Sequence, residues 1–161
     1  MSDANPTPTP ATQDASFVYV TYIRTTPEKL WAALTTPEFI HQYWFGMAVT
    51  CDWTAGSPWR LNFEDGRLAD SGEILEADPP KRLVIRWRNE FRPELTAEGH
   101  SRCTMALERM DGGAVKLTLT HALENTRPAS KFVQAVSGGW PMILSNLKSL
   151  LETGEVAMPS R

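Results

Sequence analysis

The sequence predicts an α+β fold in which a curved antiparallel sheet of about seven strands wraps around one long C-terminal helix. In residues 127–154, apolar side chains recur three or four positions apart, which is typical of a helix that buries one face along its whole length. Residues 16–121 consist mostly of short runs of alternating apolar and polar residues separated by turn dipeptides, the pattern of antiparallel strands. Two helix starts of the same form follow the first of these runs.

Length, composition and charge indicate one domain without a nucleic-acid partner. The chain has 161 residues, of which 42% are hydrophobic, enough for one core. We expect the domain to span residues 16–154, between a disordered tail at 1–15, rich in proline and small polar residues, and a short C-terminal tail at 155–161. The formal net charge of -3 gives no basic surface, so nucleic acid is not an expected partner.

Membrane insertion and metal chemistry are not expected either. No apolar run reaches the ~18 residues of a membrane span, and the N-terminus lacks the blocks of a secretion signal, so we expect a cytoplasmic protein. The two cysteines, Cys51 and Cys103, have no zinc-ligand spacing and lie among alternating apolar residues. We therefore expect no metal, no cofactor and no disulfide.

The first elements follow from local chemistry. From Phe17, the run FVYVTYI has the β-branched and aromatic composition of a strand. The words Thr26-Pro27-Glu28 and Thr36-Pro37-Glu38 each offer a capping hydroxyl, a proline suited to the first helical position and an acid near the positive end of the helix dipole. Two short helices are predicted there, and helices this short need a sheet to pack against.

The middle of the chain is predicted to be a meander of strands. Asp65-Gly66 and Asp111-Gly112 are hairpin dipeptides, and such short links make neighbouring strands antiparallel. The polar run from Glu90 to Ser101 is expected to be a mobile loop over one end of the sheet. The six strands expected here are Met47–Asp52, Pro58–Phe63, Ala69–Ala77, Arg82–Asn89, Arg102–Met110 and Ala114–His121.

The long helix has a weak centre. Gly138 and Gly139 precede Trp140 and lack side chains, and Pro141 removes the bond to the carbonyl of Ser137, so a kink is predicted. Glycines here allow the helix to approach the sheet or leave room for a guest beside Trp140. We hypothesise that residues 138–141 and the loop at 90–101 together gate a cavity between helix and sheet.

Three sequence motifs resemble those of a known protein family. They are TTPEKLWAALTTPEFIHQYW (residues 25–44), DSGEILEADPPKRLVIRW (70–87) and SGGWPMILSNLKSLLETG (137–154). Together they resemble the family of homologues of the activator of heat-shock-protein-90 ATPase, within the START-like (SRPBCC) superfamily of helix-grip folds. The resemblance spans about residues 17–154, and it implies an internal cavity for lipids, polyketides or aromatic metabolites, although such folds host many activities.

The candidate ligand-binding residues are large apolar groups expected to converge between the long helix and the sheet. Four of the six tryptophans come from the second short helix, two strands and the long helix, and offer flat apolar walls with N–H donors, although any one of them is more often a simple core residue. The residues predicted to line the cavity are Trp44, Trp59, Phe63, Ile85, Trp87, Met105, Leu119, His121, Val136, Trp140 and Leu144.

Three functions stay open from the sequence. The leading one is binding of an apolar, ring-containing small molecule. The second is a cyclase or hydrolase type of enzyme that uses His121 and a tyrosine as acid and base, although a lone histidine there is more often a hydrogen-bonded core group. The third is a stress- or chaperone-associated interaction module, which a cavity filled by its own tryptophans favours. A homodimer through the edge strand Phe17–Ile23 is an open alternative.

Overall fold

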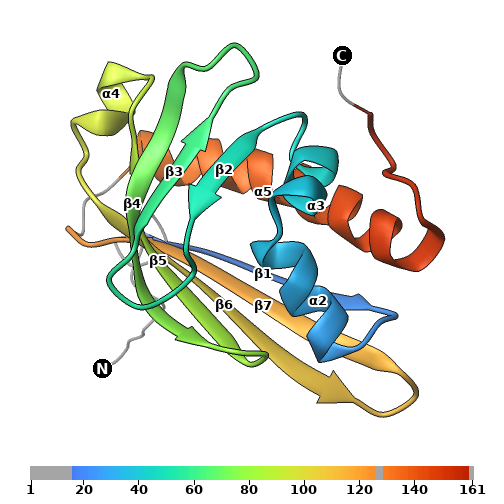
Figure 1. The fold of residues 1–161 in the computed structure, drawn as a ribbon. Coiled ribbons are helices and arrows are strands. Elements are labelled where there is room, and N and C mark those ends of the chain that lie inside the picture. The colour runs from blue at the N-terminus through green and yellow to red at the C-terminus, as the bar shows by residue number, and fades with distance from the viewer. Residues whose placement is uncertain (1–15, 126–128, 160–161) are drawn as a thin grey trace, which may run out of the picture.

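The computed structural model describes residues 16–125 and 129–159. It contains one seven-stranded antiparallel sheet in the order β1-β7-β6-β5-β4-β3-β2, which curves around the C-terminal helix α5 (Figure 1). The predicted helix-grip fold is therefore confirmed. The tail predicted at 1–15 lies outside the described residues.

Each predicted strand is present, and the bounds agree to within two residues. Alternation and turn chemistry were sufficient to place them because the connections inside the meander are short, apart from the segment between β5 and β6. β7 runs two residues beyond the predicted end at His121. The strands are β1 (Ser16–Ile23), β2 (Ala48–Cys51), β3 (Pro58–Asn62), β4 (Leu68–Asp78), β5 (Arg82–Asn89), β6 (Ser101–Met110) and β7 (Ala114–Leu123).

The two short helices are α2 (Pro27–Thr35) and α3 (Pro37–Tyr43). Both have proline in the first turn, and the side chain of Thr26 caps α2 by accepting a hydrogen bond from the Lys29 N–H at 3.2 Å. α2 contacts α3 and β6, and α3 contacts β2 and α5. The pair thus closes one end of the space inside the curved sheet.

The long helix α5 (Lys131–Thr153) begins four residues later than predicted and continues through Pro141 without a break. Its N-cap Ser130 accepts a hydrogen bond from the Val133 N–H, and Gly154 at φ 89° ends it in the left-handed conformation. The predicted stripe is buried against the sheet. Of its residues, Val133, Trp140, Ile143, Leu144 and Leu147 are buried and Val136 and Leu151 are partly buried; α5 also buries Phe132, Asn146 and Leu150.

The chain after α5 returns to the helix. The buried side chain of Asn146 donates to the carbonyl oxygen of Met158 at 2.8 Å and accepts from the Met158 N–H at 2.7 Å. Residues 155–159 therefore lie along α5, and the predicted C-terminal tail is held by the helix over that part.

The loop predicted at 90–101 has more structure than we expected. It contains the short helix α4 (Pro93–Thr96), and it buries Leu95 and Glu98, which are 2% and 6% exposed. The side chain of Thr96 also donates to the carbonyl oxygen of Asn89 at 2.7 Å. α4 contacts β5 and α5, so this segment is packed against both the sheet and the long helix.

Candidate functional site

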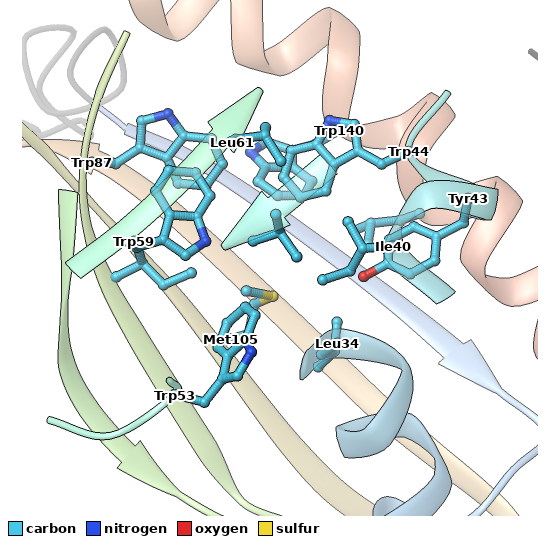
Figure 2. A pocket seen from close by; sticks show the side chains of 13 residues that line it. Leu34, Ile40, Tyr43, Trp44, Trp53, Trp59, Leu61, Trp87, Met105 and Trp140 are labelled. Carbon is cyan, nitrogen blue, oxygen red and sulfur yellow. The ribbon is translucent and has the colours of Figure 1, made fainter. Parts of the chain in front are cut away.

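Four tryptophans converge between α5 and the sheet, as Figure 2 shows. The ring of Trp87, on β5, lies at the centre, with centroid distances of 4.3 Å to Trp59, 5.9 Å to Trp44 and 5.8 Å to Trp140. Trp44 and Trp140 are themselves 5.1 Å apart. Aromatic pairs at such separations stabilise one another beyond the area they bury. The predicted convergence of tryptophans is thus present, and it forms a continuous packed cluster.

Gly72 makes the closest part of this cluster possible. Trp59 on β3 and Trp87 on β5 are both paired with Gly72 of the intervening strand β4. A Cβ atom at Gly72 would lie 1.7 Å from the carbonyl oxygen of Arg86, which no side chain tolerates. The absence of a side chain therefore lets β4 and β5 approach under the two indole rings.

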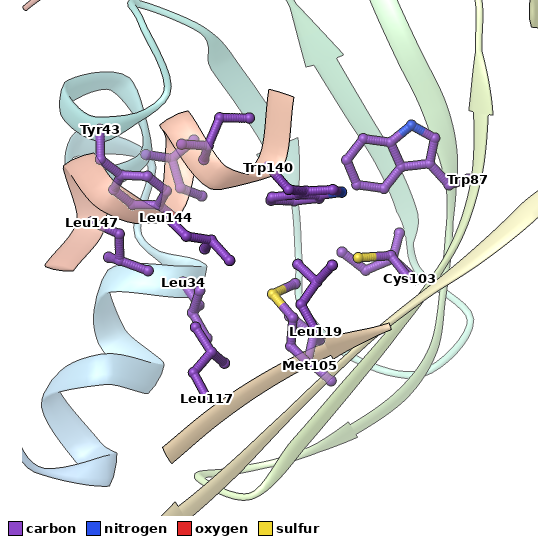
Figure 3. Close-up of a cluster of buried hydrophobic side chains, with 14 of the residues drawn as sticks. Leu34, Tyr43, Trp87, Cys103, Met105, Leu117, Leu119, Trp140, Leu144 and Leu147 are labelled. Carbon is purple, nitrogen blue, oxygen red and sulfur yellow. The ribbon is translucent and has the colours of Figure 1, made fainter. Parts of the chain in front are cut away.

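The interior space behind the tryptophans is nearly filled. The enclosed cavity there measures about 20 Å³, which is enough for about one water molecule. Figure 3 shows Trp140 lying over Met105, Leu119 and Cys103 of the sheet, with Leu144 and Leu147 of α5 beside it. The residues that line this cavity are Leu34, Ile40, Tyr43, Trp44, Val49, Trp53, Trp59, Leu61, Ile85, Trp87, Met105, Trp140 and Leu144.

A larger space is lined by three of these tryptophans, Trp44, Trp87 and Trp140. This groove of about 280 Å³, which we name the α4 groove, lies between the first half of α5, the strand ends of β4 and β5, and the segment around α4. Its walls are mostly aromatic and aliphatic. They consist of Trp44, Asp70, Trp87, Asn89, Phe91, Arg92, Leu95, Phe132, Ala135, Val136, Gly139, Trp140 and Ile143.

Asp70 is the acidic residue in the wall of the α4 groove, and it is only 8% exposed. Its Oδ1 accepts a hydrogen bond from the indole Nε1–H of Trp87 at 3.0 Å. Burial raises the pKa of Asp70 to about 7; the bond from Trp87 opposes this rise, and the negative charge of Glu90 adds to it. The carboxyl group is therefore present in both protonation states near neutral pH.

His121 is fully buried on β7 and bonded through both ring nitrogens. Nδ1 accepts from the Nε1–H of Trp140 at 3.0 Å, because an indole nitrogen can only donate. The proton is then on Nε2, which lies 2.9 Å from Oγ of Ser101, and Ser101 donates in turn to the carbonyl oxygen of Trp87. Burial lowers the pKa of His121 to about 3. This arrangement holds a neutral imidazole in the core and leaves it no free nitrogen for acid–base chemistry.

Eight of the predicted ligand-binding residues line one or both of these spaces. Trp44, Trp87 and Trp140 line both, Val136 lines the α4 groove, and Trp59, Ile85, Met105 and Leu144 line the small cavity. Phe63, Leu119 and His121 line neither space. Phe63 packs edge-on against Phe91 at 4.9 Å, and Leu119 is fully buried in the core.

Sequence reasoning missed the polar residues of the α4 groove and most of its rim. Asp70 begins the sequence DSGE, and in that context it looks like a solvent-exposed residue near the start of a strand. Asn89 stands at the end of a strand before a polar loop. One available signal was the alternation in β5, because Asn89 continues the inward-facing series of Leu83, Ile85 and Trp87.

The two segments expected to gate a cavity meet at the α4 groove. Gly139 and Trp140 contribute from α5, and Phe91, Arg92 and Leu95 contribute from the loop. Glu98 joins the loop to the N-terminus of α5: its carboxylate accepts from the Ser130 hydroxyl at 2.6 Å and from the Lys131 N–H at 2.9 Å. Whether the two segments move together as a gate stays a prediction.

The described part of the chain contains no helix long and apolar enough to cross a membrane. Within the same residues, no group of three or more histidine, cysteine or acidic side chains is arranged to hold a metal ion.

The fold and the arrangement of α5 in the sheet define a helix-grip protein of the START-like superfamily. Within it, the chain belongs to the family described as activator of Hsp90 ATPase homolog 1-like proteins, whose pattern it matches over residues 24–152. No curated protein sequence matches the chain.

Several solved structures have a similar fold. Protein MLL2253 from Mesorhizobium loti is 25% identical with a TM-score of 0.72, over 84% of this chain and 96% of that one. CalU16 from Micromonospora echinospora is 24% identical with a TM-score of 0.68, over 86% and 77%. The Aha1 dimer from Colwellia psychrerythraea is 19% identical with a TM-score of 0.70, over 86% and 97%.

Proposed function

We propose that this protein binds an apolar, ring-containing small molecule in the α4 groove, with the cytoplasm as its expected location. The observation that carries the proposal is a groove of about 280 Å³ whose walls include five aromatic side chains. Ligand sites in proteins are concave and mainly apolar, with volumes of about 300–1,000 Å³, so this groove suits a small ring system. The aromatic residues are Trp44, Trp87, Phe91, Phe132 and Trp140.

The groove replaces the interior as the expected site. The small cavity of about 20 Å³ behind the tryptophans has no room for a guest, which by itself favours an interaction module. The α4 groove has that room, and Gly139 widens it, because no atom lies within 4 Å of where its Cβ would be. Binding therefore needs no rearrangement of the tryptophan cluster.

Gly138 and Gly139 provide a matched test. Gly139 lines the groove, Gly138 is an exposed neighbour on the same helix, and both have open space at the Cβ position. In Gly139→Leu the new side chain should fill part of the groove, whereas in Gly138→Leu it should point into solvent. We expect the first variant alone to lose binding.

The experiment starts from the natively purified protein, extracted with organic solvent and analysed by mass spectrometry for a co-purifying compound. That compound, or a panel of apolar ring compounds, is then titrated against tryptophan fluorescence for the native chain and both glycine variants. No bound compound and no response to the panel would contradict the proposal. Equal binding by the two glycine variants would place the ligand elsewhere.

A second candidate function is self-association through β1. This strand is an edge of the sheet, and its outer face exposes a row of three apolar side chains, Val18, Val20 and Tyr22, at 57%, 43% and 50%. An exposed edge strand can pair with a second copy of itself across a twofold axis. Analytical ultracentrifugation of the native chain and of Val20→Lys tests this candidate. We expect a dimer that the lysine dissociates, and a monomer for the native chain would contradict it.

A further inference from the structure

Two buried polar side chains stand together in the sheet wall of the α4 groove. Asp70 of β4 and Asn89 of β5 are directly opposite partners in the antiparallel pairing, and both line the groove. Residues paired in this way project their side chains from the same face, with Cβ atoms about 4.5–5.5 Å apart. Their exposed fractions are only 8% and 6%. The groove thus contains a carboxyl group and a carboxamide side by side, among apolar walls.

Each of these side chains uses one polar atom inside the protein. Oδ1 of Asp70 accepts from Trp87, and Oδ1 of Asn89 accepts from the N–H groups of Phe91 at 3.2 Å and Arg92 at 2.9 Å. Within the described residues, Oδ2 of Asp70 and the Nδ2 amide of Asn89 have no hydrogen-bond partner. Buried polar atoms without a partner are rare in native proteins, so both point to a group that arrives from outside.

We propose that Asp70 and Asn89 form the polar anchor of the groove and that together they bind the hydroxyl group of a ring-containing alcohol or phenol. A hydroxyl has one hydrogen to donate and two lone pairs to accept with. It can donate to Oδ2 of Asp70 and accept from Nδ2 of Asn89, which satisfies both free atoms with one group. This inference rests on the proposed binding function, because it names the chemistry of the ligand in the same groove.

Other polar groups fit this pair less well. A ligand ammonium has three donors and no acceptor, so it satisfies Asp70 and leaves the Asn89 amide unpaired. A ligand carboxylate accepts from Asn89 but is repelled by the charge of Asp70 whenever that group is ionised. Arg92 also lines the groove, but its guanidinium bonds to Glu94 at 3.0 Å on the exposed side of α4.

The charges around Asp70 make pH a useful variable. The negative charge of Glu90, which is not part of the groove wall, adds to the rise in the pKa of Asp70. Besides Asp70, Arg92 is the charged residue among those that line the groove, and the lining residues from α5 and the end of α3 are uncharged. A hydroxyl ligand can bind both forms of Asp70, since a protonated carboxyl donates to the hydroxyl oxygen instead. An amine needs the ionised form and should bind better above pH 7, whereas an acid should bind better below it.

The test uses the full chain and four compounds of one shape: 4-phenylbutan-1-ol, 4-phenylbutylamine, 4-phenylbutyric acid and n-butylbenzene. Affinities are measured by calorimetry at pH 6 and pH 8, and the indole N–H resonance of Trp87 in NMR spectra reports whether the compound reaches Asp70. We expect the alcohol to bind at least roughly tenfold more tightly than butylbenzene at pH 8, since hydrogen bonds to a charged carboxylate are the stronger ones, and to stay the tighter ligand at pH 6.

Two substitutions keep the internal bonds and change only the free atoms. Asp70→Asn retains an oxygen for Trp87, and Asn89→Asp retains an oxygen for the N–H groups of Phe91 and Arg92. At pH 8, where Asp70 is mostly ionised, each should weaken binding of the alcohol by roughly tenfold and leave the affinity for butylbenzene unchanged. The comparison of ligands on the native chain remains decisive even if a variant folds poorly.

The outcomes separate the anchor from the binding function. If the alcohol and butylbenzene bind equally, or if Asp70→Asn leaves the affinity for the alcohol unaffected at pH 8, the anchor is wrong while the proposed function stands. If the amine binds more tightly than the alcohol, and more so at pH 8 than at pH 6, the anchor binds a cation and the inference is wrong. If none of the four compounds binds and no native compound is extracted, both the inference and the proposed function fail.

Discussion

The indole Nε1–H of Trp140 donates a hydrogen bond to Nδ1 of His121 across 3.0 Å and so joins the long helix to the last strand inside the core. Because Nδ1 accepts, Nε2 carries the proton and the imidazole is neutral. Ser101 completes the connection at 2.9 Å from Nε2, and all three side chains are buried. His121, which the sequence suggested as a weak catalytic candidate, therefore has a structural role: it connects α5 to β7 and β6.

Stability should fall as pH is lowered because of this histidine. The pKa of His121 is lowered to about 3 in the folded chain from 6.5, so between these values the unfolded chain holds one proton more. The free energy of unfolding should then decrease by about 1.4 kcal/mol per pH unit as pH drops from 6 towards 3 from this group alone. Urea unfolding at a series of pH values from 3.5 to 7 measures this slope of the free energy of unfolding.

The matched variants for this prediction are His121→Phe and the surface change His41→Gln. His121→Phe should lose the additional slope, and it should cost about 2–4 kcal/mol at pH 7, because the Trp140 N–H and the Ser101 hydroxyl lose their partner. His41 is exposed beside Glu64, so its variant should keep the slope of the native chain. Equal slopes for the native chain and His121→Phe would show that His121 is not buried neutral.

Asp70 should act in the opposite direction. Its folded pKa of about 7 lies above the ordinary 3.8, so its contribution to stability is fully present below pH 3.8 and is lost as pH rises towards 7. Asp70→Asn removes this loss and keeps an acceptor for Trp87. We expect the variant to gain stability relative to the native chain by about 1.4 kcal/mol per pH unit between pH 4 and 7. Urea unfolding at pH 4 and pH 8 tests this, and a constant difference contradicts it.

Gly72 and Gly138 should respond to alanine with opposite signs. At Gly72 the new methyl meets the carbonyl oxygen of Arg86, so the strands must separate beneath Trp59 and Trp87, and we expect a loss of about 2–4 kcal/mol. At Gly138 the methyl meets nothing within 4 Å, so the helix should gain about 0.5–1 kcal/mol. Urea unfolding at pH 7 compares the two. A Gly72→Ala variant as stable as the native chain would show that the strands can shift without cost.

The fold was predictable because it depends on local patterns. The alternation of apolar and polar residues in β5 and β7 determines which face of each strand is buried. The two Thr-Pro-Glu motifs mark the starts of α2 and α3. Each element therefore follows from a few adjacent residues. The convergence of Trp87 and Trp140 was predictable on the same basis, since each lies on the face that its element buries, and Trp44 follows the end of α3 directly.

The position of the free space was not predictable in this way. Whether Trp87 fills the interior or leaves a cavity depends on how its ring meets Trp59 over Gly72, a relation between three strands. Asp70 is buried because the Trp87 indole bonds to it from 17 residues away. Such contacts follow from side-chain packing in three dimensions, and periodicity does not carry that information.

Glu98 should couple the segment around α4 to the start of α5. Its carboxylate accepts from Ser130, Lys131 and Phe132, so Glu98→Gln should lower the free energy of unfolding by about 1–3 kcal/mol. Hydrogen exchange should then speed up together in residues 90–100 and in the first turn of α5. Glu94→Gln, at an exposed pair with Arg92, serves as the control and should change neither. Faster exchange in only one of these two segments would show that Glu98 does not couple them. If residues 90–101 and 138–141 of the native chain are as protected as the flanking strands, the two segments are no gate and the groove is permanently open.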